Sequence, residues 1–139
     1  MRRPVILLLG IWTCAASADP GITIIGHRDS ELGQLTRKQV ADIYMGRVTS
    51  LPNNSIPLPL DYQGESAVRT RFYQAITGKS LAQINAYWAR LSFTGQANPP
   101  RKLPDQTSIR HVVEKNQDAL GYVEGDVADP DVTPLLTIP

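Results

Sequence analysis

The spacing of apolar residues predicts strands that alternate with helices along most of this 139-residue chain. The run GITIIG at 21–26 is rich in β-branched residues and lies between glycines, a pattern typical of a short strand. Apolar residues at helical spacing follow at 35–46, where Thr36 and Gln39 form a capping box and Gly46 is placed to end the helix. This helix carries the most complete set of local signals in the chain.

The rest of the pattern extends this alternation. Residues 58–62 (LPLDY) are expected to form a strand near a sheet edge, because Pro59 has no amide hydrogen to donate to a ladder. The proline-rich residues 95–104 are expected to form a loop. Further helices are predicted at 66–78, 80–93 and 108–115, and further strands at 119–124 and 132–138. This order indicates an α/β domain with a mixed sheet flanked by helices.

The first 18 residues have the pattern of a secretory signal peptide. A positively charged start is followed by an apolar stretch over residues 5–16 and by the small-residue triplet Ala-Ser-Ala at 16–18. We expect cleavage before Asp19, which leaves residues 19–139 as one domain in the periplasm. The apolar stretch is shorter than the roughly 20 residues that span a bilayer, so no stable membrane span is expected after cleavage. A retained membrane anchor is the alternative.

Cysteine content and charge exclude several classes of protein. The single cysteine, Cys14, belongs to the predicted signal, so we expect no disulfide, no thiolate metal site and no cysteine nucleophile in the domain. Loss of Arg2 and Arg3 with the signal leaves 12 basic and 13 acidic residues, a net charge of −1 with neutral histidines. A nucleic-acid partner would require a clustered basic surface, and none is expected.

No pattern of metal ligands is evident, and we expect neither a metal nor another cofactor. His27 and His111 are the only histidines and lie far apart in the sequence. Asp126, Asp129 and Asp131 lack the twelve-residue spacing and the final glutamate of a calcium loop, so a polar turn is the better interpretation.

The turn between the strand at 58–62 and the next helix is the best candidate for a binding site. Gly64 allows the backbone to approach a ligand closely. The helix start presents unpaired N–H groups and the positive end of the helix dipole, which together attract anions. We therefore predict that Gly64, Ser66, Ala67 and Arg69 bind a phosphate-like small anion.

A purely structural interpretation of the same turn stays open. Ser66 is a favourable N-cap residue whether or not a ligand is present. Arg69 is equally suited to pair with Asp61 or Glu65. Strand–glycine–helix turns recur throughout α/β folds, so the turn alone does not decide between the two interpretations.

Four segments carry a resemblance to a known family. They are LTRKQVADIYMGR at 35–47, QGESAVRTRFY at 63–73, WARLSFTG at 88–95 and ALGYVE at 119–124. In this order they resemble the phosphate-type periplasmic solute-binding proteins of ABC importers, and the third resembles a short, single-lobe subgroup. The resemblance implies a non-enzymatic, periplasmic-binding-protein-like lobe, with phosphate as ligand and an ABC transporter as partner.

The family's Gly-Ser-Gly-Thr phosphate loop is altered in this chain. Glu65 replaces its serine and Ala67 its threonine, while Gly64 and a shifted Ser66 remain and Arg69 is placed to compensate. A carboxylate beside the helix start repels phosphate. The importer proteins also close two lobes around their ligand, whereas this chain matches one lobe, so a partner would have to supply the other half of the cleft.

Two functional hypotheses remain. The first is a periplasmic module that binds phosphate or another small anion weakly. The second is a ligand-free module that docks on a protein of the cell envelope, such as a sensor or a transporter. An enzyme is not expected, because the sequence contains no identifiable activated nucleophile or acid–base pair, and we assign no catalytic residue.

Overall fold

A five-stranded mixed sheet forms the centre of the computed structural model, which describes residues 20–51 and 53–139. The strands lie in the order β3-β2-β4-β1-β5. Strand β2 runs parallel to both β3 and β4, whereas β1 is antiparallel to its neighbours β4 and β5. The strands are β1 (Ile22–His27), β2 (Leu58–Tyr62), β3 (Arg101–Leu103), β4 (Ala119–Glu124) and β5 (Val132–Ile138). The predicted mixed sheet is confirmed.

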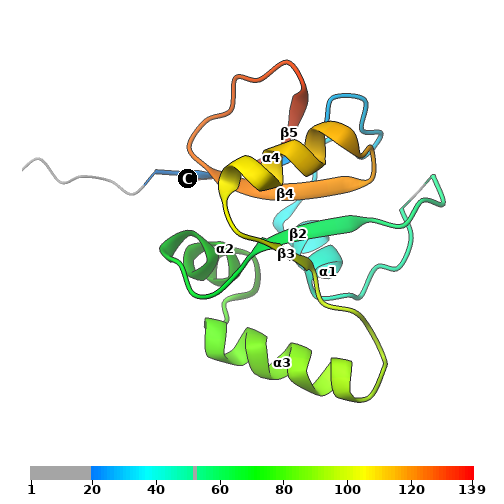
Figure 1. Cartoon of the computed structure of the whole chain (residues 1–139), viewed down its shortest axis with the longest axis vertical. Helices are drawn as coiled ribbons and strands as arrows, with labels where there is room; N and C mark the ends of the chain where they lie inside the picture. The colour runs from blue at the N-terminus through cyan, green and yellow to red at the C-terminus, as the bar shows by residue number, and fades with distance from the viewer. Residues whose placement is uncertain (1–19, 52) are drawn as a thin grey trace, which may run out of the picture.

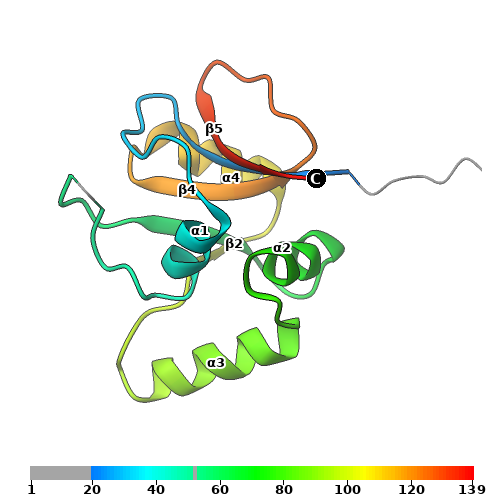
Figure 2. The same cartoon turned by 180° about the vertical axis from the view of Figure 1, so that it is seen from behind.

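Helices cover both faces of this sheet. They are α1 (Arg37–Tyr44), α2 (Ala67–Thr77), α3 (Leu81–Phe93) and α4 (Gln106–Lys115). Figures 1 and 2 show α1 and α2 on one face and α4 on the other, with α3 beyond α2 and away from the sheet. The predicted signal at 1–18 lies outside the described residues. Within the described ranges, no helix has the length and apolar character needed to cross a membrane.

The helix ends follow the local signals of the sequence. The capping boxes of Thr36 with Gln39 and of Ser80 with Gln83 are both formed. Gly78 ends α2 in the left-handed conformation, with a φ of 70°. Helix α4 begins two residues before the predicted position, because Asp105 accepts a hydrogen bond from the Ser108 amide at 2.8 Å and caps the helix.

One prediction about the strands is wrong and another is confirmed. The expected loop at 95–104 contains β3, which is too short to show a periodic pattern. Strand β2 lies near the edge of the sheet, as predicted, because only the three-residue β3 lies outside it. Pro59 is tolerated there because β3 begins opposite Leu60, so the position of Pro59 pairs on one side only, with Leu120 of β4.

An aromatic cluster joins α1 and α2 to the sheet. Phe72 of α2 stacks on Tyr122 of β4, with ring centroids 3.7 Å apart and planes within 6°. Tyr44 of α1 contacts Phe72 edge-on at 4.8 Å and donates a hydrogen bond of 2.7 Å to the Leu60 carbonyl. The buried hydroxyl is thereby satisfied, and the cluster packs the middle of α2 against α1 and β4.

On the opposite face, α4 packs closely against β4 at Gly121. A methyl group on Gly121 would overlap Cγ2 of Ile109, which is fully buried. We expect Gly121→Ala to lower the free energy of unfolding by about 1–3 kcal/mol, because the helix would have to move outward. Urea unfolding would measure this loss. Combined with Ile109→Ala, which removes the overlapping atom, the substitution should cost less than the sum of the two single changes; strict additivity would contradict this account.

Candidate functional site

The loop from β2 to α2 lies at the carboxyl end of the parallel strands β2, β3 and β4. The amide of Gln63 donates a hydrogen bond of 2.9 Å to the Leu103 carbonyl, which ties the loop to the end of β3. Gly64 has a φ of 70° and open space around it, so the turn depends on glycine for its backbone conformation. Ligands of open α/β sheets commonly bind outside this end of the strands.

The start of α2 is accessible in this loop. Ser66 is the N-cap, and its Oγ accepts a hydrogen bond of 3.3 Å from the Arg69 amide. Gly64 and Ala67 are exposed, and Ser66 is half-buried. The amides of Ser66 and Ala67 donate to no acceptor within 20–51 and 53–139. The structure thus combines the N-cap hydrogen bond with two free amide donors, a kind of group that can bind an anion.

Arg69 is buried and pairs with Asp61, one of the two partners that the sequence left open. The two residues are only 3% and 1% exposed, and Arg69 Nε lies 3.2 Å from Asp61 Oδ2. Arg69 Nη1 donates to the Gly64 carbonyl at 3.1 Å, and Nη2 donates to Oδ1 of Asn85 at 3.3 Å. The guanidinium therefore connects β2, the loop and α3.

Two tyrosines complete the surroundings of Asp61. Tyr73 donates its hydroxyl hydrogen to Asp61 Oδ2 at 2.7 Å, and Tyr122 donates to Oδ1 at 2.5 Å. Burial, and then the negative charge of Asp61, raise the pKa of both tyrosines far above that of a free tyrosine, so both hydroxyls keep their protons and act as donors. The buried carboxylate is thereby surrounded by donors, as a buried charge requires.

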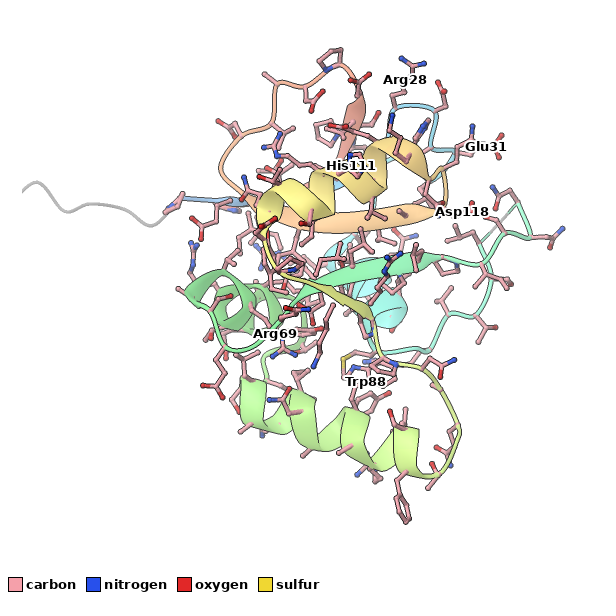
Figure 3. All side chains as sticks on the ribbon, in the orientation of Figure 1. Arg28, Glu31, Arg69, Trp88, His111 and Asp118 are labelled. Carbon is pink, nitrogen blue, oxygen red and sulfur yellow. The ribbon has the colours of Figure 1, made fainter. Side chains whose placement is uncertain are left out.

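An open pocket of about 380 Å³ lies beside this network. Gly64 and Glu65 of the loop, Asn85 and Trp88 of α3 and Lys102 of β3 contribute to its walls. Figure 3 shows Arg69 and Trp88 in the space between α3 and the sheet. Among the predicted site residues, Gly64 and Arg69 line the pocket, whereas Ser66 and Ala67 are not part of its lining.

The polar groups of the pocket differ in whether they have an ion-pair or hydrogen-bond partner. Asp61 and Arg69 neutralise each other. Glu65 and Lys102 are exposed and form no ion pair with any described residue. The indole nitrogen of Trp88 is buried without an acceptor in the described part of the chain, an unusual state for a buried donor. The sequence did not indicate Asn85 or Lys102 as site residues, because they come from two separate segments, α3 and β3.

A second polar cluster lies near the end of α4. Carboxylate oxygens of Glu114, Asp129 and Asp131 lie within 4.8 Å of one another. Asp129 lies 3.8 Å from Arg110, and Asp131 lies 3.6 Å from Arg28. The arginines balance the charge of the two aspartates, and this cluster carries no assignment of a site.

Three solved structures share the fold. A candidate phosphate ABC transporter substrate-binding protein from Clostridium perfringens, solved with bound phosphate, matches with a TM-score of 0.67 and 20% identity over 85% of this chain and 45% of that protein. An ABC-type phosphate transport receptor from Vibrio cholerae matches with a TM-score of 0.66 and 17% identity over 85% and 46% of the two chains. A candidate phosphate-binding protein from Planctomyces limnophilus matches with a TM-score of 0.57 and 14% identity over 77% and 36%.

These similarities confirm the predicted fold, one lobe of the periplasmic-binding-protein type with a mixed sheet flanked by helices. The chain matches less than half of the length of each of the three proteins. No family model matches the sequence, and no characterised protein matches it significantly.

Proposed function

We propose that the protein is a non-enzymatic solute-binding module of the periplasm that binds phosphate or another small anion at the start of α2. Its fold is that of three proteins described as phosphate-binding or as substrate-binding proteins of phosphate transporters, which supports the general role. The observation that carries the site is the exposed start of α2, with two free amides at the carboxyl end of the parallel strands. Export through the signal at 1–18 belongs to the same proposal.

Each predicted residue has a distinct part in this proposal. The amides of Ser66 and Ala67 donate to the anion, with the helix dipole behind them. The Ser66 hydroxyl accepts from the Arg69 amide and keeps its own hydrogen for the ligand. Arg69 lines the adjoining pocket and holds the loop through the Gly64 carbonyl. Because Asp61 balances the charge of Arg69 and Glu65 repels an anion, we expect weak binding.

The partner that we propose is a protein of an ABC importer. The similar proteins are substrate-binding components of such transporters, and this chain matches less than half of each. A binding surface formed by one lobe is open to solvent, so a partner that covered it would raise the affinity by excluding water. We therefore expect the isolated chain to bind its anion more weakly than the complex does.

Titration calorimetry with phosphate, sulfate and acetate tests the site. We expect a dissociation constant for phosphate of about 1 mM. Ala67→Pro removes one proposed donor at the first helical position, where proline is well tolerated, and the backbone of Ser66 (φ −140°, ψ 158°) suits a following proline. A hydrogen bond to a charged group contributes about 1.5–3 kcal/mol, so phosphate affinity should fall about ten-fold or more.

Arg37→Pro is the matched control, because Arg37 is the exposed first residue of α1. This variant should bind phosphate as the wild type does. Absence of heat with all three anions at millimolar concentration would rule out the proposed function. Undiminished phosphate binding by Ala67→Pro would place the anion elsewhere.

A further inference from the structure

We infer that the pocket between α3 and the sheet is a separate site for a small zwitterionic solute, with Lys102 contacting its anionic group and Glu65 its cationic group. The pocket adjoins the start of α2 at Gly64, but Ser66 and Ala67 do not line it. Its volume of about 380 Å³ falls in the range of small-molecule sites. The inference therefore goes beyond the anion site: Gly64 and Arg69 border both sites, but the proposed ligand contacts are Lys102 and Glu65.

The charges that remain available in the pocket define the class of ligand. Asp61 and Arg69 are buried and satisfy each other, and the three guanidinium nitrogens of Arg69 all donate to protein acceptors. What remains is one carboxylate, Glu65, and one ammonium group, Lys102, neither paired with another described residue. A simple anion would be attracted by Lys102 and repelled by Glu65, and a simple cation would be attracted by Glu65 and repelled by Lys102. A molecule with both groups gains from both.

The fold holds Lys102 in this position. In the parallel ladder of β2 and β3, Lys102 is the register partner of Asp61, so their side chains leave the sheet on the same face. Because Arg69 already neutralises Asp61, the ammonium group of Lys102 is not drawn into the buried pair. It stays at the pocket side of the sheet as an exposed cation.

Other groups of the pocket suit a small polar molecule with a short carbon chain. Asn85 accepts from Arg69 through Oδ1, which turns its amide nitrogen away from the guanidinium as a further donor. The Trp88 ring and the adjacent Pro99 and Pro100 supply apolar surface. An ω-amino acid combines the two charged ends with such a chain.

Matched probes separate the contributions of the two charges. We would titrate glycine, 3-aminopropanoate and 4-aminobutanoate into the ¹⁵N-labelled protein, each against the carboxylate and the amine with the same number of carbons. Exposed ion pairs contribute about 0.2–1 kcal/mol each, so the best amino acid should bind about 1.4- to five-fold more tightly than either analogue. The indole N–H resonance of Trp88 should shift as the pocket fills.

Charge-neutral variants assign the two contacts. Glu65→Gln should abolish the advantage of the amino acid over the carboxylate, and Lys102→Gln its advantage over the amine. Glu31→Gln and Lys115→Gln remove exposed charges outside the pocket and should leave both advantages intact. Equal binding of the amino acids and their analogues, no binding of any probe, or unchanged preferences in the Glu65 and Lys102 variants would overturn the inference. Ala67→Pro should not affect these titrations, so failure here is distinct from failure of the anion site.

Discussion

Replacement of Arg69 by methionine should lower the free energy of unfolding by about 3–5 kcal/mol. The substitution keeps an unbranched side chain in place but leaves the Asp61 carboxylate, which is 1% exposed, without its cation. Two tyrosine hydroxyls and the Tyr62 amide would still donate to Asp61, yet they do not compensate a buried charge. The loss would be measured from the midpoint and slope of urea unfolding.

Arg71→Met is the matched control for this experiment, because Arg71 lies two residues further along the same helix. Its ion pair with Glu124, at 3.3 Å, is partly exposed to water, and such pairs contribute at most about 1 kcal/mol. The two substitutions should therefore differ by at least about 2 kcal/mol. Equal losses of unfolding free energy in Arg69→Met and Arg71→Met would show that the Asp61 carboxylate does not require the charge of Arg69.

Removal of the Phe72 ring should lower the free energy of unfolding about as much as replacement of Arg69 by methionine. Phe72 is fully buried, stacks on Tyr122 and contacts Tyr44 edge-on, so Phe72→Ala leaves a cavity between α2 and the sheet. Loss of a buried phenylalanine side chain costs about 3–5 kcal/mol. Thermal or urea unfolding would measure the effect. Since Phe72 packs the middle of α2 against the sheet, the start of this helix should be held less firmly, and phosphate affinity should also fall in this variant.

The chain offers a control of the same chemistry, because Phe93 is 92% exposed at the end of α3. Phe93→Ala should change stability by no more than about 0.5 kcal/mol. If Phe72→Ala and Phe93→Ala lowered the free energy of unfolding by similar amounts, the result would contradict the packing of Phe72 between α2 and β4.

The helices were predictable because their signals are local. Thr36 and Gln39, or Ser66 and Gly78, mark a helix end through hydrogen bonds and backbone angles that involve neighbouring residues only. The arrangement of the strands has no such signal. The ladder of β2 with β3 joins residues about forty positions apart, so this pairing could not be inferred from either segment alone.

The same distinction between local and long-range signals applies to the candidate site. Arg69 and Tyr73 lie one helical turn apart on α2, so their common orientation toward β2 follows from helix geometry. Tyr122 reaches Asp61 across 61 residues of sequence, and Lys102 lies beside Asp61 only through the register of β3. Neither neighbour could be inferred before the strand order was known.

The place of β1 has a consequence for the order in which this chain can fold. Its two neighbours, β4 and β5, come from residues 119–138, and the Thr23 hydroxyl reaches the Gly125 carbonyl across 102 positions. Contacts of such separation form late, because a long loop must close first. The nascent polypeptide thus has no sheet partner for β1 until synthesis has passed residue 119.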